Sequence, residues 1–231
     1  MKTIGLIGGM SWESTQEYYR IMNEAVKSKL GGLHSAKLVL YSVDFEEIKE
    51  LQYAGRWDRL TELMVQAAQS IEAAGAEMVV LCTNTMHKMA DEVQSRVQIP
   101  LLHIADATAA KITAQGIRKI GLLGTSFTME QDFYKGRLQE RFGLEVVVPK
   151  EEDRRIVHEI IYEELCKGVI RSESKARYLE IIGRLVDDGA EGVILGCTEI
   201  TLLIHQADCG VPVFDTARIH ALQAVDAALA K

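Results

Sequence analysis

The residues best suited to chemistry in this chain are a cysteine and a threonine at matching places in an internal repeat. The segment GAEMVVLCTNT, which begins at Gly75, aligns without a gap with GAEGVILGCTE, which begins at Gly189. The alignment pairs Thr83 with Cys197. A thiol can remove or deliver a proton near neutral pH, whereas a hydroxyl can donate or relay one but cannot act as a free base. The pair predicts acid/base chemistry with unequal partners.

Cys197 is the strongest single candidate for chemistry, because it lies between a glycine and a threonine where an apolar strand ends. We expect a helix to begin there, and its N–H groups would stabilise a thiolate and lower the pKa of Cys197. Free cysteines are more often buried and inert. We accept that structural role for Cys166 and Cys209 but not for Cys197.

Small polar residues near both positions predict a binding site for an amino acid. Backbone N–H groups in Gly-rich turns and at helix starts attract carboxylates, and hydroxyl and amide groups can hold an α-amino group. Each of these residues could instead cap a helix. The duplication favours binding, and the candidates are Met10, Ser11, Asn84, Thr85, Thr125, Thr198 and Glu199.

The glycine-rich turn IGLIGGMS could suggest a dinucleotide site, but two features argue against it. Its spacing G-x-x-G-G departs from G-x-G-x-x-G, and no acidic residue stands at the end of a second strand to bind a ribose. A tight turn with Ser11 or Ser14 capping the next helix is the simpler interpretation.

The elements that must position these residues alternate between strands and helices, as a parallel α/β sheet requires. Apolar runs predict strands at residues 3–7, 37–42, 77–82, 101–103, 119–123, 145–148, 192–195 and 211–214. Helical periodicity predicts helices over residues 14–30, 57–74, 105–115, 129–142, 152–166, 172–188 and 216–230.

Two further pairs extend the repeat: TIGLIGG resembles KIGLLGT, and IPLLHI resembles VPVFDT. The chain therefore predicts an α/β fold with two pseudo-symmetric doubly wound lobes, parallel sheets and an active site in the cleft between the lobes. Lobe 1 is expected to comprise residues 1–100 plus 211–231, and lobe 2 residues 101–210. Pro100 and Pro212 lie where the chain would pass between lobes.

Composition excludes several classes of function. A formal charge of −7 and the lack of Lys/Arg runs argue against a nucleic-acid partner. The N-terminus lacks the pattern of a signal peptide, and no apolar stretch approaches membrane-spanning length, so we expect a cytoplasmic protein without a membrane partner. The four cysteines lack C-x-x-C spacing, and no His/Asp/Glu cluster predicts a metal site.

The chain resembles the PLP-independent aspartate/glutamate racemases of the Asp/Glu/hydantoin racemase superfamily. The resemblance covers essentially the whole chain and rests on GGMS near Met10, NTMH from Asn84, and GCTEI from Gly196 to Ile200. It implies an isomerase that racemises aspartate or glutamate without a cofactor, yields D-amino acids and forms a homodimer. In that family two cysteines face each other across the substrate, one as base and the other as acid.

This chain departs from the family pattern at the first cysteine, where it has Thr83. Cys82 precedes it, but neighbouring strand residues point to opposite faces. Cys82 could swing in through a bulge, Thr83 or a water could supply the second proton, or turnover could be restricted to one face. We favour the last two together, with Cys197 as the one competent base and, by similarity to glutamate racemase, a preference for L-substrates.

The resemblance also implies roles for nearby charged residues. A lysine of the family matches Lys167, which would bind the distal carboxylate, while the family arginine has no clear match and Lys49 is only the nearest cation. Glu199 stands where glutamate racemases carry a histidine. A carboxylate there would raise a thiol pKa, so we expect Glu199 to bind the substrate ammonium. His87 could tune a neighbouring group.

Three alternatives stay open. The missing arginine allows a broader-specificity amino-acid racemase. Members of the same fold with a single cysteine include decarboxylases, and related isomerases share the fold. Loss of the first cysteine could also leave a non-catalytic amino-acid-binding protein.

Overall fold

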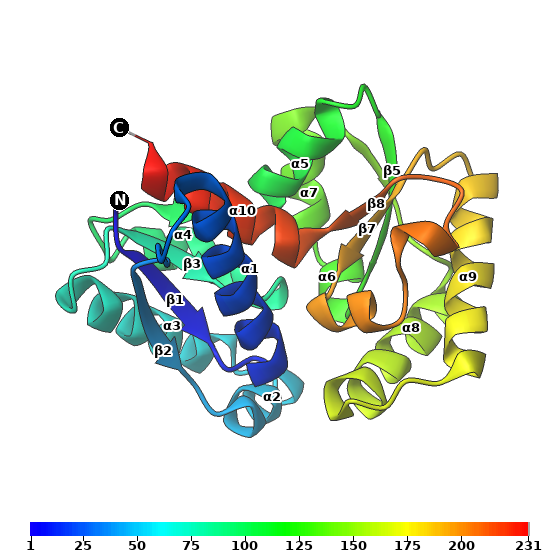
Figure 1. Cartoon of the computed structure of the whole chain (residues 1–231). Helices are drawn as coiled ribbons and strands as arrows, with labels where there is room; N and C mark the ends of the chain where they lie inside the picture. Colours follow the sequence, from blue (N-terminus) through cyan, green and yellow to red (C-terminus); the bar gives the residue numbers. More distant parts are fainter. Residues whose placement is uncertain (231) are drawn as a thin grey trace. The chain divides into compact units, whose positions relative to one another are not determined.

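The computed structural model describes residues 1–230, which form two α/β units. Unit 1 comprises Met1–Ile104 and the C-terminal segment that begins at His220, and unit 2 comprises Ala105–Ile219. Within the described residues each unit contains one parallel sheet of four strands with flanking helices (Figure 1). The predicted α/β class with two doubly wound parallel sheets is confirmed.

The sheet of unit 1 has the strand order β2-β1-β3-β4. Its strands are β1 (Ile4–Gly8), β2 (Leu38–Ser42), β3 (Met78–Leu81) and β4 (Leu101–Leu102). Helices α1 (Trp12–Leu30) and α10 (Thr216–Leu229) lie together on one face, as Figure 1 shows. The elements associated with the opposite face are α2 (Phe45–Tyr53), α3 (Trp57–Ala73), the 3₁₀ helix η1 (Thr85–Met89) and α4 (Ala90–Gln94).

Unit 2 repeats this order as β6-β5-β7-β8. Its strands are β5 (Lys119–Gly124), β6 (Glu145–Val147), β7 (Val193–Gly196) and β8 (Val213–Asp215). Its α-helices are α5 (Ile104–Thr113), α6 (Ser126–Glu130), α7 (Asp132–Phe142), α8 (Glu151–Glu163) and α9 (Ser172–Asp187). Its 3₁₀ helices are η2 (Leu165–Lys167), η3 (Thr198–Leu202) and η4 (Gln206–Asp208). In Figure 1, α8 and α9 lie on one side of the sheet and α5 and α7 on the other.

The shared strand order creates one topological switch point in each unit. The chain leaves β1 toward β2 on one side and returns to β3 on the other, and β5, β6 and β7 repeat that path. Ligands of open α/β sheets bind where neighbouring connections diverge, at the carboxyl ends of such strands. Thr83 follows β3 and Cys197 follows β7. The fold therefore places both repeat positions at switch points.

The central strands are buried on both faces, as parallel sheets require. Every residue of β1, β3 and β7 is buried, whereas the edge strands are less buried. On one face of the sheet in unit 1, Val79 and Leu81 belong to a core cluster that includes Leu60 and Met64 of α3. Burial of each such side chain contributes roughly 1.5–3 kcal/mol to folding.

Matching hydrogen bonds support the duplication. The side chain of Gln94 accepts from Leu101 N–H and donates to the Ile99 carbonyl, at 2.6 and 3.1 Å. In unit 2 the side chain of Gln206 accepts from Val213 N–H and donates to the Val211 carbonyl, at 2.9 and 3.0 Å. Gln94 thus holds the edge strand β4, and Gln206 the equivalent edge strand β8, through the same pair of hydrogen bonds.

The unit boundaries differ from those expected from the sequence. β4 pairs with β3 and therefore belongs to unit 1, and β8 pairs with β7 and belongs to unit 2. The prolines do not mark the crossings, because the carbonyl of Pro100 accepts from Val79 N–H and that of Pro212 from Val193 N–H. Each proline thus directly precedes the edge strand that completes the sheet of its unit.

Two differences concern the helices. The helix expected over residues 129–142 is divided into α6 and α7 at Gln131, whose ψ of 153° is extended. Helix α2 was not among the predicted elements, although Asp44 caps it by accepting from Glu46 N–H at 3.0 Å. Nine residues with two buried side chains give only a weak periodic signal.

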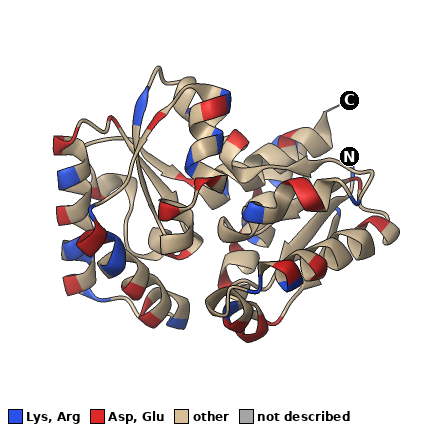
Figure 2. Ribbon diagram, turned by 180° about the vertical axis from the view of Figure 1, so that it is seen from behind, with Lys and Arg blue, Asp and Glu red and all other residues tan. Residues whose placement is uncertain are grey.

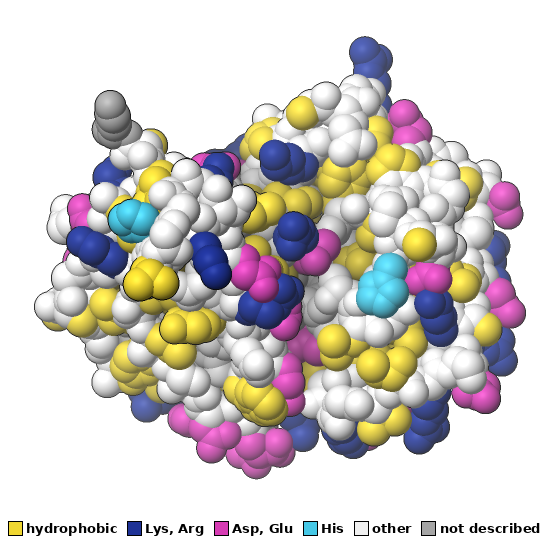
Figure 3. Space-filling model, in the orientation of Figure 1, with side chains coloured by type: hydrophobic (Ala, Val, Ile, Leu, Met, Phe, Trp, Pro, Cys, Tyr) yellow, Lys and Arg dark blue, Asp and Glu magenta, His cyan; other side chains and the backbone are white. Residues whose placement is uncertain are grey.

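Acidic and basic residues are mixed along the helices of both units, as Figure 2 shows. On the face drawn in Figure 3, basic side chains lie among acidic and hydrophobic ones. Within residues 1–230, no helix combines the length and the apolar character needed to cross a membrane. The charge pattern fits a small-molecule ligand better than a polyanion.

Candidate active site

The turn after β1 is held by side chains of α1. Gly9 has φ of +91°, and a Cβ there would collide with the backbone of Val43, so only glycine fits. Its N–H donates to Thr15 Oγ1 at 2.8 Å. Ser11 caps α1 by accepting from Ser14 N–H at 3.3 Å, which confirms the predicted cap. Met10 and Ser11 are both buried at this turn.

Thr83 follows β3, and the peptide carbonyls on both sides of its Cα are hydrogen-bonded to side chains. Ser14 Oγ donates to the carbonyl of Cys82 at 3.2 Å, and His87 Nδ1 lies 2.8 Å from the carbonyl of Thr83. A carbonyl only accepts, so Nδ1 carries the proton. Thr83 itself is partly exposed, while Asn84 next to it is buried. Unit 1 therefore gathers the β1 turn and Thr83 at one edge of its sheet.

Cys82 does not share the environment of Thr83. It has no exposed surface, and burial raises its thiol pKa far above the ordinary range. Its Sγ lies 3.9 Å from the Val80 carbonyl. A thiolate at this place is strongly disfavoured, because the surrounding protein does not solvate the charge.

Three buried histidines of unit 1, His87, His103 and His220, lie close together, and His87 contacts the Thr83 carbonyl. The ring centroids of His87 and His103 are 4.6 Å apart, and those of His87 and His220 are 5.7 Å apart. His220 Nε2 donates to the Leu102 carbonyl at 2.8 Å, and the Tyr18 hydroxyl lies 3.0 Å from Nδ1. Burial lowers the pKa of His220 to about 4, and burial together with the two neighbouring rings lowers that of His87 strongly.

Cys197 lies immediately before η3 in unit 2. Its Sγ donates to Glu199 Oε2 at 2.9 Å, and Thr198 Oγ1 donates to the same oxygen at 2.8 Å. Glu199 is buried, with 5% of its surface exposed. The Thr216 hydroxyl donates to the Leu195 carbonyl at 2.9 Å and so steadies the end of β7. The thiol and the carboxylate form a hydrogen-bonded dyad.

This environment corrects the expected pKa of Cys197. We expected a lowered value, but burial and the negative charge of Glu199 raise the pKa well above its ordinary range. The expected helix N-terminus is only the five-residue 3₁₀ helix η3, so few peptide dipoles are aligned toward the sulfur. The surroundings of Cys197 therefore favour the thiol over the thiolate.

Thr125 caps α6 after β5, in the position that matches the β1 turn. Its side chain accepts from Thr128 N–H at 3.4 Å, and Thr125 is buried. The next N–H, that of Ser126, donates to His158 Nδ1 at 3.1 Å. That N–H group is therefore already bonded, so it does not offer the free anion-binding donor that we expected at this turn.

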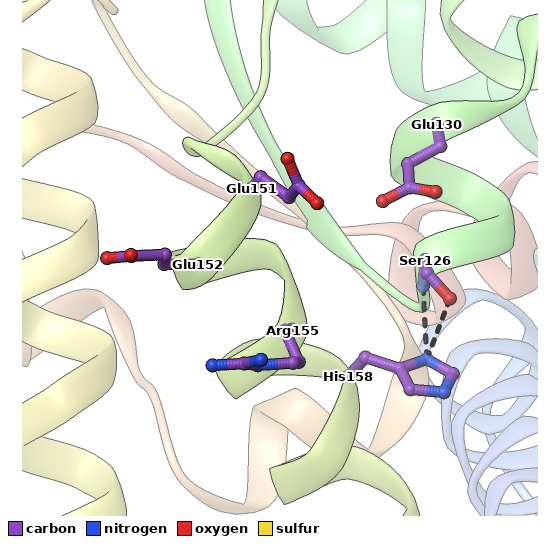
Figure 4. A pocket seen from close by; sticks show the side chains of 6 residues that line it. All are labelled: Ser126, Glu130, Glu151, Glu152, Arg155 and His158. Atoms are coloured by element: carbon purple, nitrogen blue, oxygen red, sulfur yellow. Dashed lines mark hydrogen bonds between the residues drawn. The ribbon is translucent and has the colours of Figure 1, made fainter.

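A cavity of about 500 Å³ lies beside this turn (Figure 4). In Figure 4, Ser126 and His158 point toward each other, and Glu151 points toward Glu130. Glu130 is paired with Arg154 at 2.9 Å. The cavity is lined by Ser126, Glu130, Glu151, Glu152, Arg155 and His158. Its three carboxylates would repel the carboxylates of an acidic amino acid.

The two lysines expected near the distal carboxylate lie on the surface. Lys167 pairs with Glu163 at 2.6 Å and Lys49 with Glu46 at 3.1 Å, with lysine side chains 58% and 40% exposed. Both pairs join residues three or four positions apart in the chain, which is ordinary surface pairing. Binding of the substrate by Lys167 remains a prediction.

Sequence reasoning missed several buried or half-buried polar residues. His103, His158 and His220 were not among the candidates, and Gln52 of α2 is buried with its Nε2 3.4 Å from Met86 Sδ. His103 ends a predicted strand, and His158 and His220 lie in predicted helices. Nothing in their spacing indicates that His103 and His220 meet His87. Within residues 1–230, no group of three or more His, Cys, Asp or Glu side chains could hold a metal ion.

The known proteins to which this chain is similar include several racemases and racemase homologues. The family model described as Asp/Glu/Hydantoin racemase matches residues 7–224. The crystal structure of a candidate Asp/Glu racemase from Yersinia pestis is 58% identical, covers 100% of both chains and has a TM-score of 0.94. An aspartate racemase homologue from Pyrococcus horikoshii is 40% identical over 99% of both chains, with a TM-score of 0.86.

Two more distant relatives are similar over most of the chain. The broad-specificity amino-acid racemase RacX of Bacillus subtilis is 21% identical over 98% of both proteins. Glutamate racemase from Francisella tularensis, solved with D-glutamate, is 16% identical, covers 98% of this chain and 78% of that one, and has a TM-score of 0.68. The latter shows the shared fold.

Proposed function

Because this chain belongs to the Asp/Glu/hydantoin racemase family, we propose that it racemises aspartate or glutamate without a cofactor. The observation that carries the proposal is the placement of Thr83 and Cys197 at equivalent strand ends of two sheets with the same strand order. Acid/base groups at two switch points suit a reaction that removes a proton from one face of Cα and returns one to the other.

Cys197 is proposed as the base for L-substrates. Its thiol first gives its proton to Glu199, to which it is hydrogen-bonded, leaving a thiolate and a neutral carboxylic acid. The thiolate then takes the α-proton, and the electron pair of the broken C–H bond stays on the substrate. Glu199 is thus proposed as a proton partner, in place of the ammonium ligand that the sequence suggested.

Thr83 is proposed to deliver a proton to the opposite face of Cα. It then regains a proton from solvent while Glu199 releases the one that it took up, so that all three groups return to their starting states. Its hydroxyl is a far weaker acid than a thiol and is not present as a free base at neutral pH, so the α-proton of a D-isomer, which faces Thr83, should exchange with solvent more slowly than that of an L-isomer, which faces Cys197. This asymmetry is the reason for the proposed L-preference. D-Aspartate that exchanges its α-proton as fast as L-aspartate would contradict it.

The small polar residues near the two positions are proposed to bind the substrate and the carbanion-like transition state. Asn84 and Thr85 in unit 1 and Thr198 in unit 2 offer amide, hydroxyl and backbone N–H groups. Without a cofactor to take up the electron pair, such donors must stabilise the charge that develops on the carboxylate. Met10, Ser11 and Thr125 are proposed to contribute from the turns after β1 and β5.

A broader amino-acid specificity is the second candidate. Lys167 and Lys49 are exposed and paired with neighbouring glutamates. A distal carboxylate therefore has no evident buried cation among these two residues. The similarity to a racemase named for broad specificity points the same way.

Proton NMR in heavy water tests both candidates. The purified protein, free of PLP, is incubated separately with L- and D-isomers of aspartate, glutamate and a set of neutral and basic amino acids. We expect the α-proton signal of L-aspartate or L-glutamate to disappear, and Cys197→Ser to abolish the loss. Cys209→Ser is the matched control, because Cys209 is also a partly buried thiol.

The outcomes separate the alternatives. Exchange with many amino acids would favour broad specificity, and a new decarboxylated product would favour the decarboxylase. Saturable binding of L-aspartate without exchange of any substrate would contradict a racemase and favour a binding protein.

A further inference from the structure

The buried histidine cluster of unit 1 is not used by the proposed reaction, although it contacts the backbone of Thr83. His87 is bonded through both ring nitrogens: Nδ1 donates to the Thr83 carbonyl at 2.8 Å, and Nε2 accepts from Ile104 N–H at 3.2 Å. One neutral tautomer satisfies both bonds, since a proton on Nε2 would face the N–H of Ile104. The ring is 2% exposed.

These bonds determine the conformation on both sides of Thr83. Ser14 holds the peptide carbonyl that precedes Thr83, and His87 holds the carbonyl that follows its Cα. A threonine has few side-chain rotamers, because its Cβ is branched. Fixing both flanking peptides therefore leaves the hydroxyl little freedom of direction.

The cluster also forms hydrogen bonds at the two places where the chain passes between units. The chain leaves unit 1 after Ile104, whose N–H is bonded to His87, and it returns at His220. His220 is bonded to the Leu102 carbonyl and to Tyr18, and its ring lies beside that of His87. Burial and the two neighbouring rings disfavour protonation of His87 at Nε2, where a proton would face the N–H of Ile104.

Comparison of the two copies of the repeat places the histidine cluster in unit 1, the unit that carries Thr83. The residues aligned with His87, His103 and His220 are Thr201, Asp215 and Thr108. Thr201 Oγ1 donates to the Thr198 carbonyl at 2.7 Å, one residue beyond Cys197. The histidine cluster and the weaker acid, Thr83, thus lie in the same unit. The unit with the Cys197 thiol has other residues at the three aligned positions.

We propose that His87 is a positioning residue for Thr83, which aims the hydroxyl of this poor proton donor by holding its peptide carbonyl. The inference rests on the proposed racemase function and deepens it. A thiol reacts over a wider range of geometries than a hydroxyl that must act within a short hydrogen bond. Loss of the bond therefore affects the Thr83 face more than the Cys197 face.

The test compares His87→Leu with His87→Asn, two substitutions of nearly equal shape. Asparagine keeps an N–H donor near the position of Nδ1, and leucine does not. With an L-substrate in heavy water, α-proton exchange reports on Cys197, and appearance of the D-isomer reports on delivery to the opposite face. We expect His87→Leu to lower the ratio of racemisation to exchange by roughly 10- to 100-fold, and His87→Asn to retain most of it.

His103→Leu is the matched control, because it removes a buried imidazole from the same cluster. A purely structural loss lowers racemisation and exchange together and leaves their ratio unchanged. An unchanged ratio in His87→Leu, or an equal fall in His103→Leu, would overturn the positioning role alone. Absence of exchange by the unaltered protein would overturn the proposed function and this inference with it.

A second measurement does not depend on the folding of a variant. Nitrogen NMR of the unaltered protein should show His87 as a neutral ring with its proton on Nδ1 between about pH 5 and pH 8. A neutral ring with its proton on Nε2 would overturn the proposal, because Nδ1 would then have no proton to donate to the Thr83 carbonyl.

Discussion

At the scale of single residues, the contact between Cys197 and Glu199 determines the resting state of the site. Glu199 Oε2 accepts from the thiol at 2.9 Å, and its charge together with burial raises the thiol pKa. A thiol that rests in the protonated state resists oxidation and metal binding, since both need the thiolate. In the proposed mechanism the same carboxylate accepts the thiol proton.

Replacing Glu199 with glutamine should lower the pKa of Cys197. The substitution removes a negative charge beside the sulfur and keeps nearly the same shape, while the burial that also raises the pKa remains. The measurement is a pH titration of thiolate absorbance, with Cys197→Ser to identify the signal.

Glu191→Gln is the control for this titration, because Glu191 is a glutamate of the same repeat that instead accepts from Lys119 N–H at 2.9 Å. A Cys197 pKa that is unchanged or higher in Glu199→Gln would show that Glu199 does not hold the thiol in its protonated form. Turnover should fall in the same variant, because the amide cannot take up the thiol proton.

At the scale of the elements, the end of β7 requires a glycine. Gly196 pairs with Gly124 of β5, and a Cβ on Gly196 would lie 2.7 Å from the Leu123 carbonyl. In unit 1 the aligned position is Cys82, which accommodates a side chain. The two strand ends thus differ in backbone packing directly before the proposed acid/base residues.

Gly196→Ala should destabilise the protein by about 1–3 kcal/mol, because the neighbouring atom is backbone and cannot move aside. Gly183→Ala is the matched control with the opposite expected sign. Gly183 lies exposed inside α9 with open space around it, so alanine should stabilise the protein by about 0.5–1 kcal/mol. Urea unfolding measures both, and equal shifts would contradict the packing argument.

At the scale of the whole molecule, the buried histidines make stability depend on pH. The pKa of His220 is lowered to about 4 in the folded protein, compared with an ordinary value near 6.5. Below about pH 6.5 the unfolded chain takes up a proton that the folded protein does not take up until about pH 4. The contribution to stability is therefore complete above pH 6.5 and is lost as the pH falls toward 4.

The expected loss from His220 alone is about 2 kcal/mol between pH 7 and pH 5. The contribution of His87 to stability is also lost as the pH falls, since its pKa is lowered too. Urea unfolding at the two pH values should show a smaller difference in His220→Gln than in the unaltered protein. His34→Gln is the control, because His34 is exposed. A pH dependence that His220→Gln leaves intact would locate its origin elsewhere.

The residue pattern was enough to predict the eight strands and the parallel α/β class, because buried strands and amphipathic helices have distinct periods. Its gapless repeat also paired Thr83 with Cys197, and equal strand order in the two sheets agrees with that pairing. The cap at Ser11 was likewise predictable, since it depends on residues that are neighbours in the chain.

Features that depend on residues far apart in the chain could be seen only in the folded protein. Strand pairing assigned β4 and β8 to their units, although the prolines suggested other boundaries. Folding also brought His220 beside His87, 133 positions earlier in the sequence. The raised pKa of Cys197 arises from burial and from the direction of the Glu199 side chain. Spacing along a chain does not encode solvent exclusion or side-chain direction, and these set the proton chemistry of the site.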